Sequence, residues 1–383
     1  MKNIFENLLV VELANVLAGP NVGQFFAELG AEVIKIESDN GIGDVTRSWK
    51  TATENKADSV SSYFACTNFG KKSVCLNFHK QEDTNFLYKI ISKADIVVAS
   101  YKVGDAEKLG VDYQTLSTIN PQIIYGQITG YGYENPRAGY DAIIQAESGF
   151  MYLNREADNI PQKMPVALID VLAAHQLKEA ILVALLRRKE TGKGQLVSVS
   201  LFEAGVSALV NMAAAYLCTG ISPEPIGSEH PAIVPYGKIF TTADSKQIIL
   251  AVGSDVQFSK LCKTIGIENI SKDEKFSSNV CRVNNRLELN EILSKRIAEF
   301  SAEELLNLLH KENVPAGKIN KINEVFEDPL AKKNILAGKI FDKEIKAVRS
   351  AVFNSSLGDF SLQLSPPPLL GQHTQEIKNN CGK

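Results

Sequence analysis

Apolar residues in the first 220 positions fall into short runs whose spacing alternates between that of a strand and that of a helix. Continuous apolar runs predict strands at residues 8–13, 32–36, 73–78, 95–101 and 123–129. Helical spacing predicts a helix after Gly19 and Pro20, as far as Leu29, and another at residues 80–94. Since the strand-like runs do not alternate with polar residues, both faces of each strand should be covered, as in a parallel sheet between helix layers.

A further apolar run at residues 164–169 is expected to be a strand, and Asp170 should then open a long helix that reaches Lys189. This helix carries apolar residues around most of its circumference, so we expect it to be deeply buried. Gly192 can adopt the left-handed conformation that ends a helix. His175, five residues into this helix, is expected to be a hydrogen-bonded core histidine rather than a base.

The pattern changes near Gly220, where residues 221–237 are rich in Pro and Gly and should form an exposed connection. A hairpin is predicted at residues 238–242 and 247–252, followed by helices near 257–265, 285–300 and 302–311. From about residue 320 the chain is expected to return to strands and loops.

The composition narrows the class of protein. The chain has 383 residues, of which 44% are hydrophobic and 22% charged, and a formal net charge of -3. This balance argues against nucleic-acid binding, which needs clustered Lys and Arg. The six cysteines and five histidines have no spacing typical of a metal site or a disulfide scaffold, so no metal is expected.

Two apolar segments bear on location. The first residues resemble a strand more than a signal peptide. The most apolar region, residues 201–218, is interrupted by Glu203 and Asn211 and is expected to be a buried helix rather than a membrane span. We therefore expect a cytoplasmic protein.

Asp170 is the first candidate for chemistry, because ligand sites in α/β folds gather where strands give way to helices. Asp is also a favoured helix N-cap, and caps are far more common than nucleophiles, so position alone favours the N-cap interpretation. Gly19 and Pro20 lie between the first strand and its helix, where backbone amides could face a phosphate or thioester. A plain strand-to-helix turn explains these two residues equally well.

Several segments together carry a family resemblance. They are LANVLAGP (13–20), LGAEVIKIE (29–37), GDVTRSW (43–49), NFGKKSVCLNF (68–78), GYDAIIQAESG (139–149), RRKETGKGQLVSVSLFEA (187–204), PYG (235–237), VPAGKIN (314–320) and PPLLGQHT (367–374). In this order and spacing the chain resembles the class III CoA-transferase family, which includes formyl-CoA and carnitine CoA-transferases. The resemblance spans essentially the whole chain.

The resemblance implies an α/β fold with a Rossmann-like large domain, its parallel sheet built from both chain ends, and a smaller inserted α+β domain. The expected boundaries are 1–220 and 320–383 for the large domain and 221–319 for the small one. The family assembles as an interlocked homodimer.

The resemblance also implies the activity. Members move CoA from an acyl-CoA donor to a carboxylic acid acceptor through a covalent aspartyl intermediate. The family nucleophile precedes the long helix that leads to a T-G-x-G turn, here residues 191–194, and only Asp170 matches. This match outweighs the N-cap interpretation.

Val16, Tyr101 and Lys108 occupy positions where relatives touch CoA, although Tyr101 replaces a Phe and Lys108 an Arg. The expected CoA-binding residues are Val16, Ala18, Lys72, Tyr101, Lys108, Arg137 and Asp141. Lys71, Lys72, Lys102 and Lys108 could pair with CoA phosphates, although a solvated charged surface is at least as frequent an explanation. Tyr140 and His230 are the expected substrate contacts. CoA thioesters enter as substrates, with no tightly bound cofactor, nucleic acid or membrane expected.

Departures from formyl-CoA transferase limit the analogy. Leu17 replaces a Gln, Ser38 replaces an Arg, and His230 with Pro231 replaces most glycines of its lid. Formate/oxalate exchange is therefore not expected. The HP-x-I-x-PYG pattern at residues 230–237 resembles that of relatives that use small dicarboxylates, so the resemblance implies an acid such as succinate. Two alternatives remain. The first is an acyl-CoA racemase of the same family, although Tyr140 replaces its histidine base, and a phenol is a poor proton shuttle. The second is a CoA-binding protein without turnover.

Overall fold

The structure is a computed structural model and describes residues 4–155, 160–356 and 363–381. The chain divides into two compact units. The large unit comprises Met1–Ser148, Met164–Ala214 and Lys332–Lys383, and the small unit comprises Gly149–Lys163 and Ala215–Ala331. Each unit has its own hydrophobic core, so the two are described separately.

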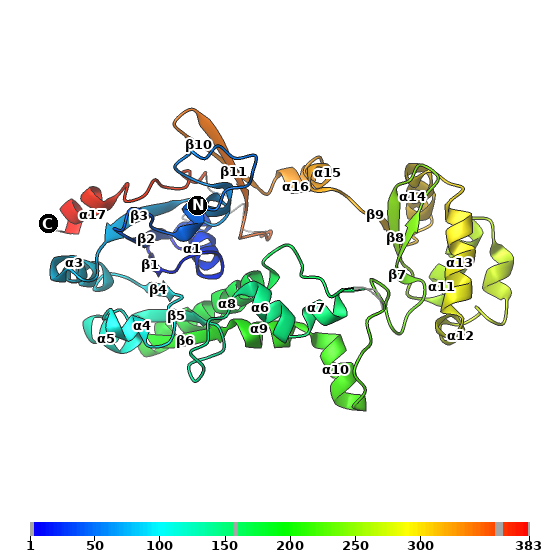
Figure 1. Cartoon of the computed structure of the whole chain (residues 1–383), viewed down its shortest axis with the longest axis horizontal. Helices are drawn as coiled ribbons and strands as arrows, with labels where there is room; N and C mark the ends of the chain where they lie inside the picture. The colour runs from blue at the N-terminus through cyan, green and yellow to red at the C-terminus, as the bar shows by residue number, and fades with distance from the viewer. Residues whose placement is uncertain (1–3, 156–159, 357–362, 382–383) are drawn as a thin grey trace. The chain divides into compact units, whose positions relative to one another are not determined.

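A six-stranded sheet with the order β3-β2-β1-β4-β5-β6 forms the centre of the large unit, and all its neighbouring strands are parallel (Figure 1). The strands are β1 (Leu9–Leu13), β2 (Glu32–Ser38), β3 (Lys71–Leu76), β4 (Ile96–Ala99), β5 (Ile124–Thr129) and β6 (Gln195–Ser200). Each strand predicted before residue 130 is present with slightly shifted ends. The strand expected at residues 164–169 is absent, because these residues lead without a strand into a helix.

Helices cover both faces of this sheet, as the non-alternating apolar runs predicted. One face packs against α3 (Gln81–Ile91), α5 (Tyr113–Ile119) and α17 (Thr374–Cys381). The other face carries α1 (Ala18–Glu28) and α8 (Leu168–Thr191), and the Ile181 side chain of α8 lies against Gly126 of β5. Shorter elements of the large unit are 3-10 helix η1 (Val45–Ser48), α2 (Ser62–Ala65), α4 (Asp105–Lys108), α6 (Asp141–Glu147) and α9 (Leu201–Ala208).

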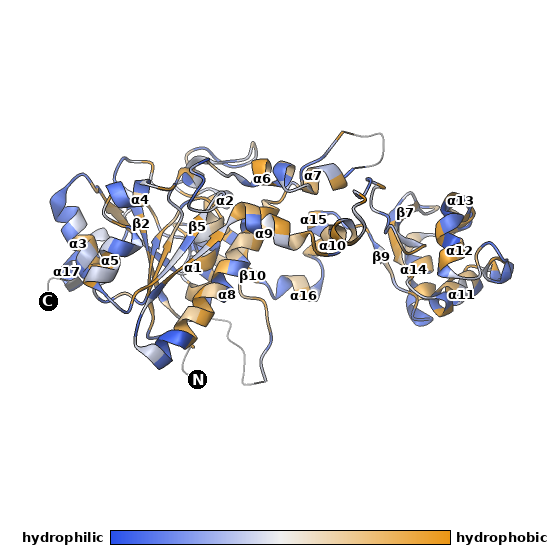
Figure 2. Cartoon of the chain, turned by 90° about the horizontal axis from the view of Figure 1, so that it is seen from below, coloured by the Kyte–Doolittle hydropathy of each residue, from blue (hydrophilic) through white to orange (hydrophobic). Residues whose placement is uncertain are grey.

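The long helix α8 ends as predicted. Gly192 adopts φ 68°, and its N–H donates to the Arg188 carbonyl. Its burial differs from the expectation, because Val183 and Leu186 are exposed and only one face of the helix is buried. His175 is exposed as well, so the core-histidine prediction is wrong. The hydrophobic colour of α8 in Figure 2 therefore covers exposed side chains as well as buried ones.

Residues 201–218 do not form the single buried helix expected from their composition. The chain bends by 75° between α9 and α10 (Val210–Thr219), and no α10 side chain is buried. Among the described residues, no single helix has the length and apolar composition of a membrane span, and only the bent pair α9 and α10 passes that test, by length and composition alone.

The small unit contains a three-stranded antiparallel sheet, β7-β8-β9, and the hairpin and helices predicted there are confirmed. Its elements are α7 (Phe150–Leu153), β7 (Tyr236–Thr241), β8 (Gln247–Ala251), α11 (Asp255–Thr264), 3-10 helix η2 (Glu268–Lys272), α12 (Asn279–Asn284), α13 (Arg286–Ile297), α14 (Ala302–Lys311), β9 (Ala316–Lys318), α15 (Ile322–Val325) and α16 (Pro329–Lys332). Apolar side chains from the sheet and from α11, α13 and α14 form its core.

The C-terminal residues return to the large unit. They add the antiparallel hairpin β10 (Ile335–Ile340) and β11 (Lys343–Val348), and then run along β3 to α17 (Figure 1). The Ser73 N–H donates to His373 Nδ1, and the His373 N–H donates to the Ser73 carbonyl. Both chain ends thus contribute to the large unit, while all six strands of its parallel sheet precede residue 201.

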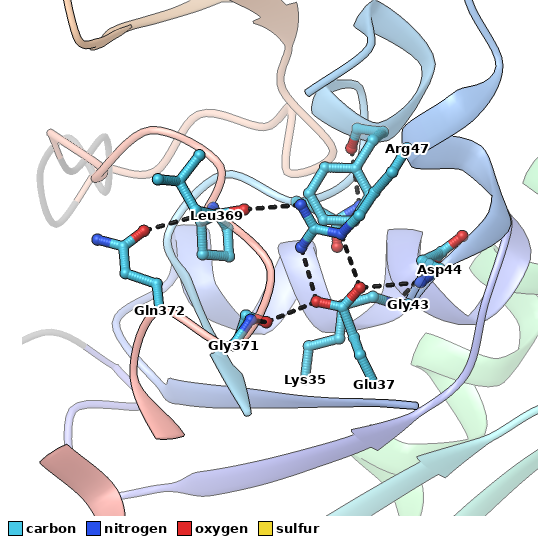
Figure 3. Close-up of polar contacts among 12 residues, drawn as sticks. Lys35, Glu37, Gly43, Asp44, Arg47, Leu369, Gly371 and Gln372 are labelled. Carbon is cyan, nitrogen blue, oxygen red and sulfur yellow. Dashed lines mark hydrogen bonds and ion pairs between the residues drawn. The ribbon is translucent and has the colours of Figure 1, made fainter. Parts of the chain in front are cut away.

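A buried ion pair fixes this return (Figure 3). Arg47 donates to Glu37 through Nε at 2.8 Å and through Nη2 at 2.6 Å, and its Nη1 donates to the Pro368 carbonyl at 3.0 Å. The guanidinium also lies 3.7 Å from the ring centroid of Phe64. One side chain therefore joins the end of β2 to the C-terminal segment.

Substituting Arg47→Met should lower the free energy of unfolding by roughly 3–5 kcal/mol, because it leaves the buried Glu37 carboxylate without its cation. Urea denaturation measures this change. Lys346→Met, which breaks an exposed ion pair with Glu344 on the same unit, should cost less than about 1 kcal/mol. Equal losses for the two variants would contradict this account of the Arg47 contact.

Candidate active site

A pocket of about 200 Å³ lies at the carboxyl ends of β1, β4 and β5. Its walls come from residues 15–19 after β1, residues 100–103 after β4, residues 128–130 at the end of β5, and residues 135–141. Strand order reverses between β1 and β4, since β2 and β3 lie on one side of β1 and β5 and β6 lie beyond β4. Ligands of parallel α/β sheets bind at this kind of switch point.

Asp170 reaches this pocket from the first turn of α8. It is the third helical residue, and Ala167 occupies the N-cap position, so the N-cap interpretation of Asp170 is wrong. Among the residues that the structure describes, none donates a hydrogen bond to the Asp170 carboxylate. Burial and, second, the negative charge of Asp141 raise the pKa of this carboxyl to about 7.

The capping role falls to Asp141 instead. Its Oδ1 accepts the Ile169 N–H at 2.9 Å, which satisfies a free amide in the first turn of α8. Its Oδ2 accepts a hydrogen bond from Gln145 at 2.8 Å, and Gln145 Oε1 accepts the Met164 N–H. The start of α6 therefore holds the start of α8, and with it the backbone of Asp170.

Two glycines bring Asp141 to this place. Gly130 follows β5 and Gly139 precedes α6, and their backbones touch. A Cβ atom on Gly139 would lie 2.5 Å from the Gly130 Cα, and a Cβ on Gly130 would lie 2.6 Å from the Gly139 nitrogen. Neither position accepts a side chain, so this contact requires glycine at both ends.

Comparisons with known proteins identify one family over nearly the whole chain. A model of CoA-transferase family III matches residues 5–374. The chain belongs to CoA-transferase family III. The succinate–glutarate CoA-transferase of Agrobacterium fabrum is 36% identical over 378 residues, covering 96% of this chain and 93% of that protein. The succinyl-CoA:glutarate CoA-transferase of Mus musculus is 35% identical over 382 residues, covering 97% and 85%.

A solved structure supports the same assignment. The crystal structure of a CAIB/BAIF family protein from Brucella suis matches with a TM-score of 0.86 and 37% identity, covering 100% of both chains. The chain is therefore a CoA-transferase, and the α/β fold expected from the family resemblance is confirmed.

The structure places several predicted residues of this CoA-transferase in the pocket; they are Val16, Ala18, Tyr101, Arg137, Tyr140, Asp141 and Asp170. Burial raises the pKa of the Tyr101 phenol to about 12, so this side chain is a neutral wall of the pocket. His230 belongs to the small unit, where its ring lies 5.5 Å from that of Tyr236 and its Nδ1 accepts the Ala232 N–H.

The predicted cations are more dispersed. Lys72 lies at the start of β3 and pairs with Glu32 and Glu376, outside the pocket lining. Lys71 is buried and pairs with Glu12, so the suggestion that it holds a phosphate is wrong. Lys108 is exposed on α4 and pairs with Asp105. Lys102 lines the pocket with Arg137, whose guanidinium bonds to Glu147 and Tyr131.

Sequence reasoning missed Tyr63, whose pKa rises to about 12 through burial first and the Asp170 charge second. Its side chain therefore lies within electrostatic reach of the candidate nucleophile. Nothing in its local spacing signals this, since α2 is separated from α8 by a hundred residues of sequence. Asn15 and Ser100 also line the pocket. Asn15 lies just beyond the strand predicted at residues 8–13, and Ser100 lies near the end of the strand predicted at residues 95–101, so the sequence did place both near the carboxyl end of a strand.

Asp170→Asn should stabilise the protein more at high pH than at low pH. The folded state raises the carboxyl pKa from 3.8 to about 7, so between these values it binds a proton that the unfolded state has lost. Stability from this group is present at low pH and falls as the pH rises towards 7. Since Asn resembles the protonated acid, the gain in Tm of the variant over the original protein should be larger at about pH 8 than at about pH 5.

Thermal denaturation across this range measures the effect, with Asp105→Asn as the control because Asp105 is an exposed carboxylate on α4. A Tm difference for Asp170→Asn that does not change with pH would contradict the raised pKa.

Proposed function

We propose that this CoA-transferase works through a covalent intermediate on Asp170. The observation that carries the proposal is the Asp170 carboxylate itself, which lies in the switch-point pocket without a hydrogen-bonding partner among the described residues. A structural carboxylate at a helix start would be occupied as a cap, as Asp141 is. An available carboxylate oxygen is what a nucleophile requires.

The exchange proceeds by acyl transfers that conserve charge and atoms. An Asp170 oxygen attacks the donor thioester carbon, the C–S bond breaks, and a mixed anhydride forms with release of CoA thiolate. The thiolate attacks the aspartyl carbonyl, giving an enzyme thioester and the donor acid. The acceptor carboxylate then attacks that thioester, and the released thiolate takes the acceptor acyl group from the second anhydride. Asp170 is regenerated, and no net oxidation or reduction occurs.

The raised pKa of Asp170 suits this chemistry. A carboxylate with a pKa of about 7 is substantially ionised at neutral pH and more basic than an ordinary Asp. Greater basicity makes it a stronger nucleophile towards the thioester carbon. The burial that raises the pKa also limits access of water to the anhydride, which would otherwise hydrolyse.

We place CoA along the pocket, against the backbone of Val16 and Ala18 and the ring of Tyr101. Arg137 and Lys102 are the cations of the lining and are proposed to meet the pyrophosphate. Lys108 follows the pocket residues 100–103 on an exposed helix and is proposed for a phosphate outside the pocket. Lys72 would have to leave two ion pairs to take part, so its support is weakest.

We propose small dicarboxylates as the acids. The relatives from Agrobacterium fabrum and Mus musculus are named for transfer between succinate or succinyl-CoA and glutarate. Tyr140 is 63% exposed at the pocket and can donate a hydrogen bond to a second carboxylate. His230 is proposed as a further substrate contact. The cytoplasmic location stays a prediction.

We also propose an interlocked homodimer. Support comes from α10, whose apolar side chains include Val210 at 69% and Leu217 at 78% exposure, and which Figure 2 draws mostly in the hydrophobic colour. An apolar helix without buried residues is typical of a surface that a partner covers. The family resemblance supplies the interlocked arrangement.

Incubating the enzyme with succinyl-CoA and hydroxylamine should leave a hydroxamate on Asp170, because both proposed acyl intermediates are electrophilic at that carbonyl. Peptide mass spectrometry locates the modification. Asp170→Ala should lower kcat by a factor of roughly 10⁴ or more. As a control, Glu344→Ala removes an exposed carboxylate outside the pocket lining and should keep the original rate. Full turnover by Asp170→Ala, or a hydroxamate on another residue, would exclude this intermediate.

Dilution to nanomolar concentration should leave a dimer, because interlocked chains cannot separate without opening. Analytical ultracentrifugation over a concentration series, with circular dichroism on the same samples, measures association and folding together. Any loss of dimer should coincide with loss of structure. A folded monomer in reversible equilibrium with a dimer would be incompatible with interlocking.

A further inference from the structure

The turn between β1 and α1 forms one wall of the pocket and contains a strained residue. Val16 adopts φ 72°, in the left-handed region that β-branched residues strongly avoid. Such a backbone persists only where its surroundings enforce it. Val16 sets the direction in which residues 17–19 enter α1, and all of them line the pocket.

Asp44 is the group that contacts Val16. The Val16 N–H donates to both carboxylate oxygens of Asp44, at 3.4 and 3.3 Å. Asp44 is completely buried and lies outside the pocket lining. Three contacts fix its orientation. The Thr46 N–H and Oγ1 donate to Asp44 Oδ1 at 3.0 and 2.7 Å, and Lys35 Nζ lies 2.9 Å from Asp44 Oδ2.

Lys35 holds the other end of the turn. The same Nζ donates to the Ala14 carbonyl at 2.7 Å and pairs with Glu12 at 2.9 Å. The buried ion pair between Lys35 and Asp44 thus holds the turn at two points: Lys35 binds the Ala14 carbonyl, and Asp44 binds the Val16 N–H. Figure 3 shows Lys35 and Asp44 with the neighbouring Glu37, which accepts the Asp44 N–H.

Resting on the proposed function, we propose that Asp44 is a positioning residue for acyl-CoA binding. It holds Val16 in the left-handed conformation, so that the backbone of residues 15–19 keeps the shape that faces CoA. Asp44 touches no substrate and acts only through the turn. Without its second anionic oxygen, Val16 relaxes towards an ordinary φ and the pocket wall moves.

Asp44→Asn tests this role, because Asn keeps the size of the side chain but presents an N–H either to Lys35 or to Val16. Hydrogen–deuterium exchange of the peptide containing residues 14–18 should become faster in the substrate-free enzyme. The KM for succinyl-CoA should rise about tenfold, with a much smaller change in the KM for the acceptor acid. Leu87→Ala is the control for general destabilisation, since Leu87 is a fully buried residue of α3 that lies outside the pocket lining.

Val16→Gly provides an independent arm, because glycine adopts φ 72° without strain. Asp44→Asn should therefore raise the KM for succinyl-CoA less in the Val16→Gly background than in the original protein. If Asp44→Asn does not fold, Thr46→Val removes one bond to the same carboxylate and should raise this KM about threefold.

The outcomes separate the two hypotheses. Faster exchange together with the KM increase and the smaller effect beside Val16→Gly supports the positioning role. Unchanged exchange, or a KM increase that Leu87→Ala reproduces, overturns it and leaves the proposed function intact. Faster exchange with an unchanged KM for succinyl-CoA overturns the placement of CoA in this pocket, and the positioning role with it.

Discussion

The large unit depends on a buried charge cluster that joins its first three strands. Glu12 of β1 lies opposite Lys35 of β2 in the strand register, and Lys71 of β3 reaches the second oxygen of Glu12. All three side chains are fully buried, so none can exchange its partner for water. A slip of one residue between β1 and β2 would turn Lys35 to the opposite face and leave Glu12 with less compensation. The pairing of Glu12 with Lys35 therefore favours the observed register of β1 and β2, and that register in turn brings the two charges together.

The same cluster shapes the elements around it. Gly23 allows α1 to lie directly over Glu12, since a Cβ atom there would fall 1.9 Å from Glu12 Oε2. Lys71 also donates to the Pro20 carbonyl at 2.8 Å, in the first turn of α1. The β1–α1 turn is consequently held by Lys35 before it and by Lys71 after it. Residues 14–17, which lie between β1 and α1 and belong to neither element, therefore gain a defined conformation from the buried Lys35 and Lys71.

Local signals in the sequence were sufficient for most elements. Strand runs before residue 130, the hairpin β7–β8 and the left-handed Gly192 all depend on residues close together in the chain, and all are confirmed. The burial of α8 was overestimated. Apolar residues around a helix show which side chains can be buried, but only the elements that pack against the helix determine which of them are buried. The bend between α9 and α10 and the exposure of α10 depend likewise on packing that hydrophobicity alone does not encode.

The site was predictable only in part, for the same reason. Asp170 was singled out by family resemblance, whereas its local sequence suggested a cap. The group that caps α8 is Asp141, twenty-eight residues before Ile169, and that contact exists only after Gly130 and Gly139 have brought α6 to the end of β5. Lys71 and Lys72 are adjacent in sequence, yet one is buried in an ion pair and the other half-exposed, because they point to opposite faces of an edge strand. The domain boundaries at residues 220 and 320 stay a prediction.

Asp141 has two effects on Asp170, one through the backbone of α8 and one through its own charge. A residue that caps a helix usually stabilises the anions of the first turn, since it orders amides whose dipoles favour negative charge. Here the cap is itself an anion close to Asp170. Burial raises the pKa of Asp170 first, and the negative charge of Asp141, the residue that fixes the backbone, raises it further. Moving the cap to a neutral Ser or Asn would preserve the helix start but make the Asp170 carboxylate less basic. One side chain, Asp141, therefore contributes both to the position of the Asp170 carboxylate and, after burial, to its raised pKa.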